Sequence, residues 1–91
     1  MNINEIYKQY NSIPGNITGN PEAIQERINH YTQQLEQTIT DSKNRKLQKW
    51  QRELAKNKIQ HVRKELKSWQ DVYNDVVEEL TNWYNNKPIT D

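Results

Sequence analysis

The apolar residues between positions 62 and 83 recur at alternating steps of three and four residues. This spacing places them on one face of an α-helix, which turns by about 100° per residue. Leu47, Trp50, Leu54 and Ile59 fall within the same half of the helix, so we predict one long amphipathic helix over residues 44–86. We call its regular apolar face the seam. It consists of Val62, Leu66, Trp69, Tyr73, Val76, Leu80 and Trp83.

The side of this helix opposite the seam is basic in its first half. Residues 43–67 hold ten basic and two acidic residues, whereas the segments before and after them carry net charges of −3 and −4. The basic side chains fall within about 120° of rotation and extend over about 33 Å. We call them the basic ridge and predict that they bind a partner. The ridge consists of Arg45, Lys46, Lys49, Arg52, Lys56, Arg63, Lys64 and Lys67.

Two shorter helices are predicted upstream. Residues 3–12 form the first, with Asn2 as its N-cap and Glu5 in a position typical of a capping box. Residues 13–20 hold both glycines of the chain and one proline, which indicates a turn-rich loop. Asn20 then caps a second helix over residues 21–41, because the proline that follows is suited to the first helical position.

A break between the second helix and the long helix is predicted near residues 40–44. If the second helix simply continued, Leu47 would lie about 100° away from its apolar stripe. The side chains of Thr40, Asp41 and Ser42 can supply acceptors for a new helix start. The alternative is one continuous helix of about 65 residues with a phase shift in its apolar stripe.

These elements predict an all-α fold, packed as a helical hairpin or as a three-helix, coiled-coil-like bundle. One small domain spans residues 1–91. Pro88 ends the long helix at residue 86, and residues 87–91 form a tail. Only 32% of the residues are hydrophobic, so one chain buries a thin core and a homodimer would add to it. Basic residues early and acidic residues late in a helix oppose its dipole. We therefore expect two long helices to pair antiparallel near Leu66, or residues 21–41 to fold back.

The sequence favours no catalytic, metal-binding or cofactor-binding function. Cysteine is absent, and no apolar stretch approaches the roughly 18 residues of a membrane span, so we expect a cytoplasmic protein. His30 and His61 lack the spacing of a zinc site. Neither glycine belongs to a phosphate-binding loop, and no serine has the flanks of a hydrolase nucleophile. We expect no enzymatic activity, no cofactor and no metal.

The chain is similar in size and helicity to the small helical-hairpin proteins of the type VII secretion class. It departs from their Trp-x-Gly turn, because Trp50, Trp69 and Trp83 are followed by Gln-Arg, Gln-Asp and Tyr-Asn. Their Tyr-x-x-x-acid tail signal is absent as well. We therefore assign the chain to no family from its sequence.

The sequence instead favours a non-enzymatic protein-interaction module. We expect a small adaptor, regulator or inhibitor whose basic ridge docks on an acidic surface of a larger, nucleic-acid-handling protein. Direct nucleic-acid binding through residues 43–67 is one alternative, since regularly spaced cations can follow phosphates. A structural coiled-coil oligomerisation protein is another. The simplest interpretation of the ridge is a solvated face that is paired with acidic segments of the same chain or of a second chain.

Overall fold

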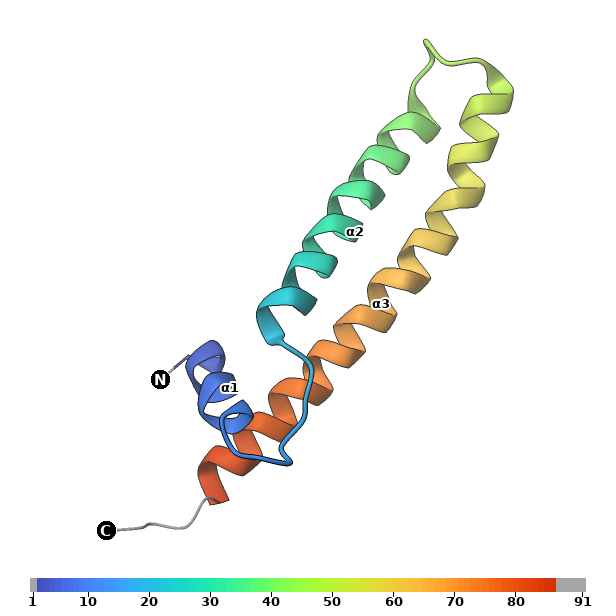
Figure 1. Cartoon of the computed structure of the whole chain (residues 1–91). Coiled ribbons are helices and arrows are strands. Elements are labelled where there is room, and N and C mark those ends of the chain that lie inside the picture. The colour runs from blue at the N-terminus through green and yellow to red at the C-terminus, as the bar shows by residue number, and fades with distance from the viewer. Residues whose placement is uncertain (1, 87–91) are drawn as a thin grey trace.

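The computed structural model describes residues 2–86 as three helices and the loops between them (Figure 1). They are α1 (Ile3–Asn11), α2 (Pro21–Lys43) and α3 (Lys49–Asn86). Helices α2 and α3 form an antiparallel hairpin, and the molecule is a rod of 67 × 19 × 17 Å. The predicted all-α hairpin is confirmed. Our predictions for Lys87, Pro88 and the tail lie outside the described residues.

The first two helices begin at the caps that the sequence predicts. The Glu5 N–H donates to Oδ1 of Asn2 at 3.0 Å, and the Asn2 amide donates back to the Glu5 carboxylate at 3.5 Å. Oδ1 of Asn20 accepts from the Glu22 N–H at 3.0 Å, and Pro21 occupies the first helical position. Each cap satisfies one of the amides that a helix start leaves without a partner.

The turn between α2 and α3 lies later than the sequence predicts, at residues 44–48 rather than 40–44. The Thr40 and Ser42 hydroxyls donate to carbonyls within α2, at 3.0 and 2.6 Å, and so do not cap a new helix. Asn44 is the C-cap of α2, and its Oδ1 accepts the Lys46 N–H within the turn at 3.0 Å. The long helix starts at Lys49 and not at residue 44, and the Gln48 carbonyl accepts the first of its amides, from Gln51 and Arg52.

The main core lies at the end of the rod away from this turn, which we call the base. There α1 packs against α3, and the start of α2 joins them. Leu80 and Val76 are buried, and Trp83 stacks edge-on against Tyr10 with ring centroids 5.4 Å apart. The buried members of the cluster are Ile6, Tyr10, Ile24, Val76 and Leu80.

A single carboxylate links three segments at the base. Glu79 on α3 accepts the Tyr10 hydroxyl of α1 at 2.9 Å and the Thr18 hydroxyl of the loop at 3.3 Å. The hydrogen bond to this carboxylate, together with burial, raises the pKa of Tyr10 above its ordinary value.

The loop before α2 packs closely on the hairpin at Gly19. A Cβ at this position would lie 3.0 Å from the Ile24 side chain and 3.3 Å from that of Val76.

The seam is packed within the chain. Val62, Val76 and Leu80 are buried, the last two in the cluster with α1 and α2, and the other four seam residues are half-buried. The guanidinium of Arg27 on α2 covers Trp69 at 5.5 Å from the ring centroid. The fold-back of residues 21–41 therefore supplies the partner that the seam needs. A homodimer stays a prediction that one chain does not test.

No helix within residues 2–86 is long and apolar enough to cross a membrane.

Candidate functional site

The basic ridge is divided between the turn and α3. Arg45 and Lys46 lie in the turn and not on the long helix as predicted, because α3 begins only at Lys49. On α3 the ridge runs from Lys49 to Lys67, which is about 27 Å at 1.5 Å per residue. All of its members except Arg52 are exposed.

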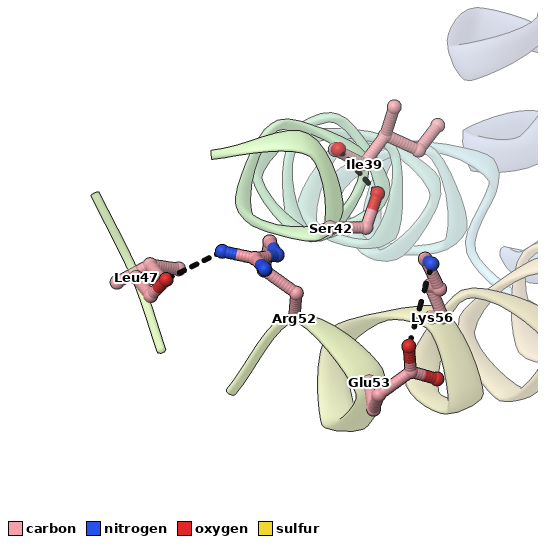
Figure 2. A network of polar contacts seen from close by, with 6 residues as sticks. All are labelled: Ile39, Ser42, Leu47, Arg52, Glu53 and Lys56. Carbon is pink, nitrogen blue, oxygen red and sulfur yellow. Dashed lines mark hydrogen bonds and ion pairs between the residues drawn. The ribbon is translucent and has the colours of Figure 1, made fainter. Parts of the chain in front are cut away.

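Arg52 has a structural contact that sequence reasoning missed. Its Nη1 donates to the Leu47 carbonyl at 2.6 Å, and the side chain is half-buried (Figure 2). The Arg52 amide also donates to the Gln48 carbonyl at 3.1 Å. This arginine therefore holds the turn against the first turn of α3 and contributes less to the free basic surface than its neighbours.

The rest of the ridge is not neutralised by the acidic residues of α2. Among residues 2–86 the one side-chain ion pair joins Lys56 to Glu53 at 3.5 Å, one helical turn apart on α3 (Figure 2). Both side chains are more than half exposed, at 57% and 54%. Such a pair contributes little, because solvent screens it. The described residues therefore show no ion pair across the hairpin that would support pairing of the ridge with acidic segments of the same chain.

Trp50 and Leu54 form an exposed apolar pair at the end of the rod that carries the turn. Each is 59% exposed, although the sequence places both on the apolar side of the helix. Ala55 is the buried residue of α3 here, and the buried residues of α2 near the turn, Thr38 and Ser42, are small and polar. They offer no apolar surface that would cover a tryptophan. We call this end the tip and the exposed pair the tip patch.

The tip patch separates two shallow hollows. One lies on the outer side of α3, measures about 750 Å³ and is mostly apolar, with Lys49 and Glu53 at its edge. The other lies between α3 and α2, measures about 610 Å³ and has Asp41 and Lys58 at its edge. The Trp50 indole N–H donates to Oε1 of Gln48 at 2.6 Å, so the polar edge of the ring is satisfied while much of the ring stays exposed.

The charge around the tip patch is strongly positive. Residues 41–58 contain seven basic and two acidic residues, whereas residues 68–86 at the base contain four acidic residues and no basic one. Because the rod is 67 Å long and the Debye length at physiological salt is about 8 Å, the two ends do not neutralise each other. The tip therefore presents an apolar centre within a positive field.

The tip patch faces away from the ridge residues Arg52 and Lys56. At about 100° per residue, Trp50 and Leu54 are rotated by about 120° and 160° from Lys56 around the α3 axis. A linear polyanion that follows the ridge would not place its bases on the Trp50 ring. A partner that wraps the tip can contact both surfaces.

No group of three or more His, Asp or Glu side chains within residues 2–86 is arranged to hold a metal ion. His30 packs edge-on against Tyr31 on α2, and His61 is exposed on α3. Both buried hydroxyls near the tip, those of Thr38 and Ser42, donate to backbone carbonyls.

No model of a known protein family matches the chain, and no curated protein or solved structure matches it significantly.

Proposed function

We propose that this chain is a non-enzymatic protein-interaction module, a small adaptor, regulator or inhibitor that docks by its tip on an acidic surface of a larger protein. The observation that carries the proposal is the exposure of Trp50 and Leu54 side by side within the most basic part of the molecule. Tryptophan and arginine dominate the binding energy of protein interfaces. Contiguous exposed apolar side chains rimmed by polar ones are typical of docking sites.

The tip patch favours a protein over a nucleic acid as the partner. Leu54 offers no ring on which a base could stack, although stacking is what aromatic platforms contribute to single-strand binding. Two of the ridge cations near the patch, Arg52 and Lys56, are rotated from Trp50 by about 160° and 120° around the α3 axis. Nucleic-acid contact through residues 43–67 remains the alternative function, because the exposed cations at the tip lack ion pairs with α2 and would release counterions from phosphates.

A photocrosslinking experiment tests the proposal. A benzoylphenylalanine residue at position 50 should give a specific protein adduct in the source cell, whereas the same residue at exposed position 33 on α2 should not. The double variant Trp50→Ala/Leu54→Ala should lose the purified adduct partner, and His61→Ala should keep it. Identical adducts at positions 50 and 33 would contradict docking by the tip.

A gel shift separates the two functions. Binding of duplex DNA, single-stranded DNA or RNA at physiological salt would support the nucleic-acid function instead. On duplex DNA the logarithm of the affinity should then fall with the logarithm of the salt concentration, with a slope near −0.9 per phosphate neutralised. Our proposal predicts no gel shift under these conditions.

The proposal includes the compartment and the oligomeric state that the sequence favours. The absence of cysteine is typical of a reducing compartment, which supports the cytoplasm. A homodimer, as in a structural coiled-coil protein, would need a surface other than the packed seam, and the exposed Trp50 and Leu54 of the tip patch offer one. Light scattering after size exclusion tests this, since a dimer through the tip should dissociate in Trp50→Ala/Leu54→Ala.

A further inference from the structure

One flank of α3 is covered by a helix at the base and left open at the tip. Leu54 and Val72 are 18 residues apart, which is five turns at about 3.6 residues per turn, so they lie on one line along α3. Glu79 lies within about 20° of that line and Trp50 within about 40°. Helix α1 contacts the flank at Glu79, which is itself exposed, because the Tyr10 hydroxyl donates to its carboxylate at 2.9 Å.

The helix that covers this flank at the base is short and amphipathic. Helix α1 has nine residues, and its apolar side chains recur at steps of three, one and three: Ile3, Ile6, Tyr7 and Tyr10. Ile6 and Tyr10 are buried against Val76 and Leu80 of α3. This flank of α3 therefore accepts a helix of only about two and a half turns through one apolar stripe.

At the tip the same flank offers a comparable surface without a covering element. The hollow of about 610 Å³ lies between two helices, with Thr38 and Asp41 from α2 and with Trp50 and Leu54 from α3. Figure 1 shows α1 beside the far end of α3, so residues 2–86 supply no third helix at the tip. The apolar wall of this hollow comes from α3, through Trp50 and Leu54, and its α2 wall is polar. A groove between two helices that offers an apolar wall is a common seat for an amphipathic helix.

The charges at the tip define the polar side of that helix. Lys49 and Lys58 edge the two hollows, and Arg45 and Lys46 lie exposed in the turn beside them. Only Asp41 and Glu53 oppose them within residues 41–58. Acidic residues beside an apolar stripe would gain from this field, whereas basic ones would be repelled.

We infer that the tip binds a short amphipathic helix of the partner, one that carries acidic residues beside its apolar stripe. This inference rests on the proposed function, because it names the kind of segment with which an acidic partner occupies the tip. The apolar stripe packs on Trp50 and Leu54, and the acidic side chains face Lys49 and Lys58.

A set of three synthetic peptides tests the inference. The first is an acetylated and amidated, Ala- and Glu-rich peptide with four leucines at the spacing of the α1 stripe. The second has the same composition with leucines at alternate positions, which favours a strand over a helix. The third keeps the helical spacing and replaces every Glu with Lys. Amide shifts of the ¹⁵N-labelled chain and peptide circular dichroism are the measurements.

We expect the first peptide to bind with a Kd below about 1 mM, to gain helicity, and to shift the amides of residues 47–58. The second and third peptides should bind at least about tenfold more weakly. Trp50→Ala should weaken the first peptide by about tenfold or more, as for an interface hot spot. Val72→Ala, on the same flank but outside the tip, should leave its affinity unchanged.

Three results would overturn the inference. These are equal binding of the helical and the alternating peptides, equal binding of the Glu and Lys peptides, and amide shifts outside the tip. Shifts at the tip that grow with the concentration of the chain alone would identify a second copy as the occupant and overturn it too. If no peptide binds while position 50 still crosslinks to a protein, the inference fails and the proposed function stands. If position 50 gives no specific protein adduct, the proposed function itself is refuted.

Discussion

Two leucines on α3 provide a direct test of the packing described above. Leu80 is 0% exposed, whereas Leu54 is 59% exposed. Both lie on the same helix and both lose the same atoms in a substitution to alanine. The helix propensity changes equally at the two sites, so that any difference in stability reports the burial.

The expected difference is large. Full burial of a leucine side chain contributes about 1.5–3 kcal/mol, and the cavity left by truncation adds to this, so Leu80→Ala should cost about 3–5 kcal/mol. Leu54→Ala should cost less than about 0.5 kcal/mol, as for other surface substitutions. In a domain of this size each kcal/mol shifts the Tm by about 4–8 °C, which predicts a loss of at least about 12 °C for Leu80→Ala and under about 4 °C for Leu54→Ala.

Thermal unfolding followed by far-ultraviolet circular dichroism measures both values. Leu66, which is half-buried in the seam, should give an intermediate loss. Equal losses at Leu80 and Leu54 would mean that the base is no better packed than the tip, and the assignment of the core to the base would be wrong. A larger loss at Leu54 would show that the tip patch is buried in solution.

Further substitutions test three individual contacts. Glu79→Gln should lower the pKa of Tyr10 toward its ordinary value, measured by ultraviolet titration, because a neutral amide replaces the carboxylate. Since that pKa is higher in the folded state, the stabilisation is complete below the unfolded pKa of about 10 and is lost as the pH rises above it; Tyr10→Phe should reduce this alkaline loss in urea unfolding. Asn20→Ala should cost about 1 kcal/mol by removal of the α2 cap, and an unchanged urea midpoint would contradict the cap. Arg52→Gln should cost about 1.5–3 kcal/mol through its bond to the turn, whereas Lys56→Gln, which removes the same charge, should cost under about 1 kcal/mol.

The helices, and the starts of the first two, could be predicted because their signals are local. Asn2 and Asn20 act through hydrogen bonds that span two or three residues, and such contacts are visible in a short stretch of sequence. The turn was placed about four residues too early for the same kind of reason. A serine or threonine hydroxyl can bond back within a helix as well as cap a new one, and Thr40 and Ser42 bond back.

The tip patch could not be predicted, because its exposure depends on the partner helix. The periodicity of the sequence identifies the apolar half of α3, which spans about 180°. It does not show which part of that half α2 covers. A signal existed in the seven-residue spacing of Ala55 with Val62, Trp69, Val76 and Trp83, which is the repeat of two packed helices. That repeat aligns Ala55 with the seam and leaves Leu54 beside it.

The hairpin also removes the argument for a dimer that rests on the helix dipole. Basic residues near the start of α3 oppose the dipole of an isolated helix. In the hairpin the carbonyl end of α2 lies beside the amide end of α3 at the tip. The negative partial charge of the first end and the positive partial charge of the second therefore offset each other there. What remains is repulsion among the cations of residues 43–58, of which only Lys56 has an ion pair, and that pair is exposed. An acidic partner would relieve this repulsion where the apolar patch lies, which is why both features support docking at the same end of the rod.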